Sequence, residues 1–156
     1  MKRILVFLSL LVSLPALAEG HRAQVAYPAD YKAECGSCHV PFPPSLLNKA
    51  DWGRTMQGLD KHFGTDASLD AKTASSIGAW LKQHAGSRAD VGATPPRITT
   101  GAWFKREHRE VPAASWKDPR IKSPANCAAC HRGAEQGRFG EREIAIPGLG
   151  RNFDDD

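Results

Sequence analysis

The chain has 156 residues, a formal net charge of +4, a hydrophobic fraction of 41% and a mean hydropathy of −0.42. This length suits one domain or two small lobes, and the low hydropathy leaves material for only a modest protein core. The sequence holds no phosphate-binding loop, nucleophile triad or catalytic carboxylate pair. We therefore expect neither an enzyme nor a nucleic-acid-binding protein.

The first 18 residues are typical of a secretory signal peptide. Lys2 and Arg3 form a basic start, an apolar run follows, and Ala16-Leu17-Ala18 provides small residues for cleavage. The apolar run is shorter than the roughly 20 residues that a membrane-spanning helix needs. We expect cleavage after Ala18 and a soluble periplasmic protein without stable membrane insertion; an uncleaved membrane anchor is the alternative.

The next feature is the motif Cys35-x-x-Cys38-His39, on a short helix expected over residues 31–39, and it recurs as Cys127-x-x-Cys130-His131. Cys-x-x-Cys-His is the attachment signature for c-type haem. Two thiols add to the vinyl groups of the porphyrin, and the following histidine binds the iron. The motifs use all four cysteines. We predict two covalently attached haem c groups, held by Cys35, Cys38, Cys127 and Cys130, with His39 and His131 as proximal iron ligands.

Three simpler interpretations of the cysteines compete with haem attachment. A Cys-x-x-Cys pair can be a redox-active dithiol or half of a zinc site. A zinc ribbon needs its two pairs roughly 15–20 residues apart, far fewer than separate Cys38 from Cys127. Two structural disulfides fit the even count but leave the two histidines unexplained.

Two helices are expected after a turn-rich loop at residues 40–44. The first is predicted to have Asp51 as its N-cap and to stop at Gly64. The second is predicted to begin after Ser68 or Asp70 and to end before Gly86. Apolar residues recur at helical spacing in both. They are Trp52, Met56, Leu59 and Phe63 in the first, and Ile77, Trp80 and Leu81, with His84, in the second.

The second half of the chain contains fewer helical signals. Thr99 or Thr100 is expected to cap a helix that carries Trp103, Phe104 and His108, and residues 111–124 form a loop before the second motif. The fold class predicted is mainly α with much irregular chain, arranged as two small haem-binding lobes that share a haem-dependent core. The boundaries are a signal peptide at 1–18, a first haem lobe at 19–86, a connector at 87–96, a second haem lobe at 97–142 and a tail at 143–156.

Each iron keeps one open axial position once the motif histidine is bound. His62 lies 23 residues beyond His39, which leaves enough chain to fold back over the first haem. His108 follows an aromatic-rich helix and precedes the second motif. These two histidines are favoured as distal ligands, although either one could instead be a surface histidine. The remaining candidates are His84, which rivals both, His21 near the new N-terminus, and Met56, which fits a core position better.

The chain resembles the small bacterial dihaem cytochrome c family over nearly its whole mature length. The resemblance rests on both motifs and on four short segments, Pro43-Pro44-x-Leu46-Leu47, Trp52 with His62-Phe63-Gly64, Pro96-Arg97-Ile98-Thr99, and Trp103-Phe104 with His108. It implies that both haems are ligated by two histidines, with His39 and His131 as proximal ligands and His62 and His108 as distal ones. Which distal histidine serves which haem is assumed here only from proximity in the sequence. The resemblance also implies a membrane b-type cytochrome as electron donor and a small monohaem c-type cytochrome as acceptor.

The function expected is periplasmic electron transfer by two low-spin haems that relay single electrons between other redox proteins. A related alternative is the small dihaem subunit of a periplasmic reductase, which the wide separation of the two motifs disfavours. An alternative of another class is a haem enzyme or ligand sensor with one open iron site. Low-spin spectra and slow CO binding would distinguish the electron-transfer protein from that enzyme.

Charge is unevenly distributed along the sequence. Residues 97–142 hold ten basic and five acidic side chains, whereas residues 19–96 hold eight of each. We expect either that the second lobe presents a basic docking face to an acidic partner, or that its arginines pair with haem propionates.

Overall fold

The computed structural model describes residues 25–147. The proposed signal peptide, His21 and the last nine residues of the tail lie outside this range. Within residues 25–147, no helix combines the length and the apolar character that crossing a bilayer requires.

The described chain is built from four α-helices joined by 3-10 turns and irregular segments. The α-helices are α1 (Ala29–Cys35), α2 (Lys49–Gln57), α3 (Ala71–Gln83) and α4 (Ala102–Glu107). The 3-10 helices are Pro44–Leu46, Leu59–Lys61, Ile98–Thr100, Ser115–Lys117, Cys127–Ala129, Ala134–Gln136 and Glu141–Glu143. Pairing between extended segments in this part of the chain is limited to two isolated bridges, His62 with Thr65 and His131 with Ile144. The fold class predicted from the sequence, mainly helical with much irregular chain, is confirmed.

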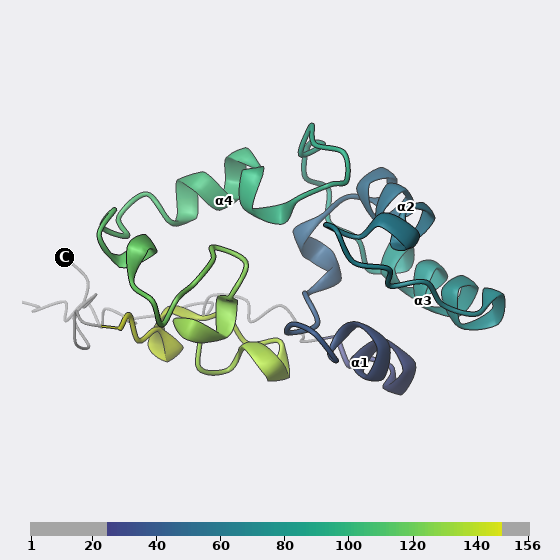
Figure 1. The fold of residues 1–156 in the computed structure, drawn as a ribbon, viewed down its shortest axis with the longest axis horizontal. Helices are drawn as coiled ribbons and strands as arrows, with labels where there is room; N and C mark the ends of the chain where they lie inside the picture. The colour runs from purple at the N-terminus through teal and green to yellow at the C-terminus, as the bar shows by residue number, and fades with distance from the viewer. Residues whose placement is uncertain (1–24, 148–156) are drawn as a thin grey trace, which may run out of the picture.

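The helices are distributed unevenly between two halves of the molecule. Figure 1 shows α1, α2 and α3 together on one side, and α4 with the 3-10 turns of the C-terminal half on the other. A single hydrophobic cluster fills the first half, with Tyr31, Leu47, Trp52, Ile77 and Leu81 at its centre. In the second half, the buried apolar residues are Phe104, Ile121, Ala134 and Ile146. The second half therefore has little aliphatic core of its own.

Helix α2 begins three residues earlier than the sequence predicted. Its N-cap is Asn48, whose side-chain oxygen accepts the backbone N–H of Asp51 over 2.8 Å. Asp51 is fully buried in the first turn, where it forms an ion pair with Arg54 and accepts the backbone N–H of Val91. The prediction that Asp51 is the N-cap is wrong, because Asn48 caps the helix and the Asp51 carboxylate binds Arg54 and the Val91 N–H from inside the first turn.

The same helix also ends earlier than expected. It stops at Gln57, with Gly58 as its C-cap, and a 3-10 turn follows. Glycine has low helix propensity, and this one interrupts the apolar spacing on which the longer prediction rested. As a result His62 lies at the end of a tight turn and not on the face of a long helix.

The other helix boundaries follow local capping chemistry. The side chain of Asp70 caps α3 by accepting hydrogen bonds from the backbone N–H groups of Lys72 and Thr73. Of the two starts predicted for this helix, after Ser68 or after Asp70, the second is confirmed. Helix α4 begins after Gly101, not after Thr99 or Thr100, because those threonines lie in a preceding 3-10 turn. Helix α1 covers Ala29–Cys35 and ends before the motif histidine, so His39 follows a turn and not a helix.

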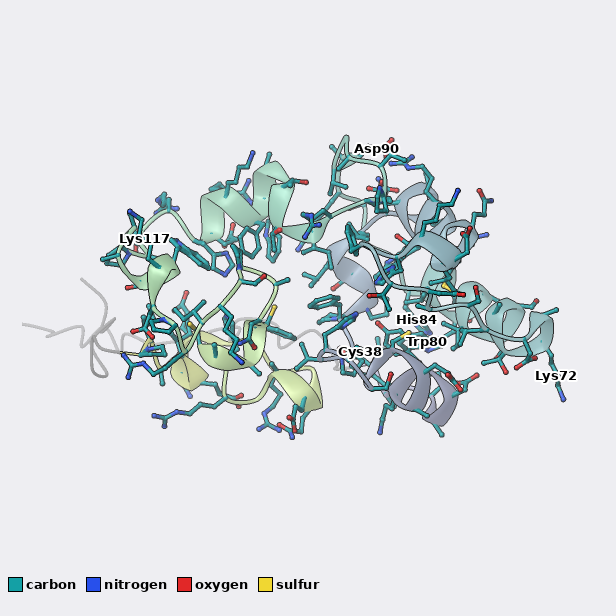
Figure 2. The ribbon with its side chains drawn as sticks, in the orientation of Figure 1. Cys38, Lys72, Trp80, His84, Asp90 and Lys117 are labelled. Carbon is teal, nitrogen blue, oxygen red and sulfur yellow. The ribbon has the colours of Figure 1, made fainter. Side chains whose placement is uncertain are left out.

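The segment predicted as a connector is tied to the first half. The side chain of Asn48 donates to the carbonyl of Arg88 and to the carboxylate of Asp90. Figure 2 labels Asp90 in this segment, next to the first-half helices. These contacts fix the chain that leads from α3 to α4. The lobe boundaries given above stay a prediction.

Candidate haem site

The first motif is positioned by the end of α1 and by the loop that follows it. Cys35 is the last residue of α1 and packs against the hydrophobic cluster, whereas Cys38 is exposed. Two hydrogen bonds of 2.7 Å each fix this loop to the first-half core. The hydroxyl of Tyr31 donates to the carbonyl of Phe42, and the indole N–H of Trp52 donates to the carbonyl of Pro44. The motif is therefore attached to the packed core of the first half.

His39 has a fixed ring orientation. Its Nδ1 lies 2.8 Å from the carbonyl oxygen of Val40, and the ring stacks on Phe42 with centroids 4.7 Å apart. Because a carbonyl can only accept, Nδ1 carries the proton and Nε2 keeps its lone pair. Nε2 is thus prepared to bind a metal.

The ring of His62 lies opposite that of His39. The two ring centroids are 6.2 Å apart and the ring planes make an angle of 30°. His62 reaches this place from a turn in which Phe63 adopts a positive φ of 50°. Burial, and then the nearby His39, lower the pKa of His62, so the neutral, metal-binding form is favoured.

The second motif makes a matching arrangement with α4. The 3-10 turn Cys127–Ala129 presents the cysteines, and the backbone N–H of His131 donates to the Cys127 carbonyl over 2.8 Å. His108 lies at the C-cap of α4, where its Nδ1 donates to the Phe104 carbonyl over 2.9 Å. The rings of His108 and His131 have centroids 6.1 Å apart and planes at 77°.

Both histidine pairs have the separation that a shared iron requires. A metal–nitrogen bond of about 2 Å on each side places the centroids of two coordinating imidazoles about 6 Å apart. The measured centroid separations of 6.2 and 6.1 Å match this value. Each pair therefore fits one haem iron between its rings.

Aromatic side chains surround each pair. The ring of Phe63 packs against that of His62. Phe63 is 42% exposed, which is unusual for a phenylalanine. The guanidinium of Arg97 lies over the Phe63 ring, 4.2 Å from its centroid. Trp116 lies near His108, and Phe139 lies near His131. An apolar porphyrin beside the histidines would cover such surfaces, and Arg97 provides a cation for an acidic substituent.

The other candidate ligands do not join either pair. His84 is the C-cap of α3, and its ring packs against Trp80 with centroids 5.4 Å apart. Figure 2 labels both side chains at the end of α3 opposite Lys72. Met56 packs against the hydrophobic cluster, as expected for a core residue.

The state of the cysteines does not support the simpler interpretations. All four lie within the described residues, and none forms a disulfide. Burial raises the pKa of Cys35 and that of Cys127 to about 11 each, whereas a redox-active dithiol needs a lowered pKa. Within residues 25–147, no group of three or more histidine, cysteine or acidic side chains is arranged for direct metal binding.

One neighbour of the site was not identified from the sequence. The start of the tail pairs with the second motif, since the Arg132 N–H donates to the Glu143 carbonyl and the Ala145 N–H donates to the Cys130 carbonyl, over 3.1 and 2.8 Å. Glu143 and Ile144 consequently lie beside His131. No local sequence signal marks this contact, because it depends on a turn of the chain through residues 133–142.

Comparison with known proteins identifies the family. The profile of the family Dihaem cytochrome c matches residues 31–139. A crystal structure of a diheme cytochrome c from Shewanella baltica is 41% identical, with a TM-score of 0.70, and the match covers 79% of this chain and 95% of that one. Two structures of diheme cytochrome c from Rhodobacter sphaeroides are 39% and 38% identical, with TM-scores of 0.64 and 0.66. They cover 74% and 75% of this chain, and 99% and 100% of their own.

No curated protein matches the chain. The family match nevertheless spans more than half of the sequence, and the three related structures share the fold at substantial identity. The predictions of the family and of its two haems are confirmed. The chain belongs to the dihaem cytochrome c family and is an electron-transfer protein with two covalently bound haem c groups.

Proposed function

We propose that this protein relays single electrons between other redox proteins through two haems, each ligated by two histidines. Cys35 and Cys38 would hold the first haem, and His39 and His62 would bind its iron. Cys127 and Cys130 would hold the second, and His131 and His108 would bind its iron. The observation that carries this proposal is the separation of the ring centroids, 6.2 Å in one pair and 6.1 Å in the other.

The haem supplies reversible one-electron chemistry, and the chain limits the haem to that chemistry. An imidazole on each face of the iron leaves no position for oxygen, peroxide or another ligand. The rings of His39 and His108 are held by backbone carbonyls through Nδ1, so each keeps its ligand nitrogen oriented in both oxidation states. Little has to move when the electron arrives or leaves.

We further propose a periplasmic location, with a membrane b-type cytochrome as donor and a small monohaem c-type cytochrome as acceptor. Support comes from the signal-like residues 1–18 and from the family resemblance. The exposed cationic residues on α4, Lys105 and Arg106, suit an acidic partner.

Spectroscopy of the purified exported protein tests the proposal. Ferric optical and EPR spectra should show only low-spin iron, and the reduced protein should bind CO slowly. Mass spectrometry should give the mass of the cleaved polypeptide plus two haems. Substantial high-spin iron with rapid CO binding would replace the electron-transfer function with that of a haem enzyme or a ligand sensor.

Ligand variants then test the assignment of each histidine. His62→Ala should convert only the first haem to an altered spin state, and His108→Ala only the second. His84→Ala is the matched control, because this half-exposed histidine lies at the C-cap of α3 against Trp80. If His84→Ala changes a spin state and His62→Ala does not, the ligand assignment is wrong, although two haems remain.

A further inference from the structure

The two proximal histidines differ in what surrounds Nδ1, the ring nitrogen that faces away from an iron bound at Nε2. In His39 this nitrogen donates to a neutral backbone carbonyl. In His131 it is buried and has no hydrogen-bond partner in the described chain. A buried N–H without an acceptor is costly, so the surroundings of His131 require a partner.

Glu143 supplies the complementary atom. Its Oε2 is also buried and without a hydrogen-bond partner in the described chain. The backbone pairing of residues 143–145 with the second motif brings this side chain beside His131. The Oε2 atom lies against the backbone of Gly133, which is two residues after His131. One unsatisfied donor and one unsatisfied acceptor thus lie in the same small region.

Two neighbours set the position of the carboxylate. Arg138 donates from Nε to Oε1 of Glu143 over 2.6 Å, which occupies one oxygen and leaves the other free. Gly133 is buried against the same carboxylate, and a Cβ at this position would overlap Oε2 and Cδ of Glu143. Glycine at 133 therefore provides the space that the carboxylate fills.

We propose that the Glu143 carboxylate accepts a hydrogen bond from Nδ1–H of His131 in the haem-loaded protein and thereby lowers the reduction potential of the second haem. This inference rests on His131 being an iron ligand, as proposed above. A carboxylate partner raises the basicity of the ligating imidazole and adds negative charge near the iron. Both effects favour Fe(III) over Fe(II). Glu143 is a positioning residue, because it acts through His131.

The test is an EPR-monitored redox titration of the haem-loaded wild type and of Glu143→Gln. Glutamine has the shape of glutamate and removes only its charge. We expect the second haem to favour Fe(II) about tenfold more than in the wild type, which corresponds to a rise of about 59 mV for a one-electron couple. The potential of the first haem should not change.

Glu141→Gln is the matched control. Glu141 belongs to the same 3-10 turn and loses the same charge, but it is exposed. Its substitution should leave both potentials unchanged. Gly133→Ala provides a second variant, which keeps the charge but displaces the carboxylate, and it should raise the second potential in the same direction.

An unchanged second potential in Glu143→Gln, or equal shifts at both haems, would overturn the inference. An unchanged potential in Gly133→Ala would show that no hydrogen bond is involved and would overturn it as well. These failures are distinguishable from failure of the proposed function, because histidine ligation is read separately from the low-spin EPR signals of the wild type. If the wild type is low-spin but Glu143→Gln does not shift the potential of the second haem, only the role of Glu143 is rejected and the proposed function stands.

Discussion

At the scale of single residues, the two facing histidine pairs, which we propose as iron ligands, differ in the angle between their imidazole planes. The planes of His39 and His62 make an angle of 30°, whereas those of His108 and His131 make an angle of 77°. Near-parallel planes split the energies of the two iron d orbitals that interact with the rings. Near-perpendicular planes leave these orbitals almost equal in energy.

This difference predicts two distinct EPR signals in the oxidised protein. The first haem should give a rhombic low-spin spectrum, and the second a highly anisotropic low-spin spectrum. His62→Ala should remove only the rhombic signal, and His108→Ala only the anisotropic one. Two identical rhombic signals would contradict the ring geometry described here.

A second prediction at this scale concerns acid stability. The Asp118 carboxylate accepts hydrogen bonds from the backbone and the guanidinium of Arg120, which lower its pKa from 3.8 to about 2. A carboxylate with a depressed pKa in the folded state stabilises the protein above its unfolded pKa, and this contribution is lost as the pH falls from about 4 to about 2. Because the Arg120 side chain of this pair is exposed to solvent, we expect a small effect.

Asp118→Asn should therefore reduce the thermal midpoint slightly at neutral pH, and the difference from the wild type should shrink as the pH falls to about 2 and vanish below it. Thermal unfolding, followed by circular dichroism at several pH values between about 7 and about 2, measures the difference in midpoint between the variant and the wild type. A difference that persists unchanged at pH 2 would show that the ion pair with Arg120 is not its source.

At the scale of elements, capping decides where the longest helix begins. The Asp70 side chain accepts two backbone N–H groups at the start of α3. This helix carries two of the fully buried core residues, Ile77 and Leu81, each 1% exposed. The cap thus fixes the register that places those residues in the core.

Asp70→Ala should lower the free energy of unfolding, since alanine cannot satisfy the first N–H groups of the helix. Asp70→Asn should preserve most of the stability, because asparagine is an equally good N-cap. Chemical denaturation of the haem-loaded proteins measures both. Equal losses in the two variants would contradict the capping role.

At the scale of the whole molecule, the two halves differ in how much core the polypeptide itself supplies. The continuous hydrophobic cluster lies in the first half, around Tyr31, Trp52 and Leu81. The second half buries few apolar side chains, and most of its ordered segments are single turns. Its stability should depend strongly on the apolar surface of its haem.

Replacing both cysteines of the second motif, Cys127→Ser with Cys130→Ser, tests this dependence. Without covalent attachment, the second half should lose most of its protection against hydrogen exchange, whereas α3 should remain protected. The matched variant at the first motif, Cys35→Ser with Cys38→Ser, should leave more residual structure. Equal protection of both halves in the first variant would show that the polypeptide alone stabilises the second half.

The charge of the second half leads to a last prediction. Several of its arginines form ion pairs with nearby acids, as in Arg106 with Glu107, Arg109 with Glu110 and Arg120 with Asp118. An excess of basic side chains remains in residues 97–142. Electron transfer to an acidic redox protein should therefore slow as salt is raised beyond about 0.1 M, where the Debye length is about 10 Å. A neutral small oxidant is the control.

Rates with the acidic protein that do not depend on ionic strength would remove the docking interpretation. The basic residues would then serve mainly to neutralise haem propionates. Arg97, placed over Phe63 beside His62, already has a position suited to that second role.

The sequence by itself determined the cofactor chemistry, because Cys-x-x-Cys-His places every group needed for attachment and one iron ligand within five consecutive residues. It also identified His62 and His108 as candidates, and it located α3 from local periodicity and a capping aspartate. These features depend on neighbours close in the chain, so local pattern is sufficient to find them.

Only the tertiary structure decided which histidines lie opposite each other, and at what angle. His39 and His62 are separated by α2 and two 3-10 turns, and no pattern in the intervening residues states how these turns direct the chain. The early end of α2 at Gly58, the burial of Asp51 and the return of Glu143 to the second motif are likewise long-range outcomes. Each reflects packing and hydrogen-bond partners that come together only when distant segments fold against one another.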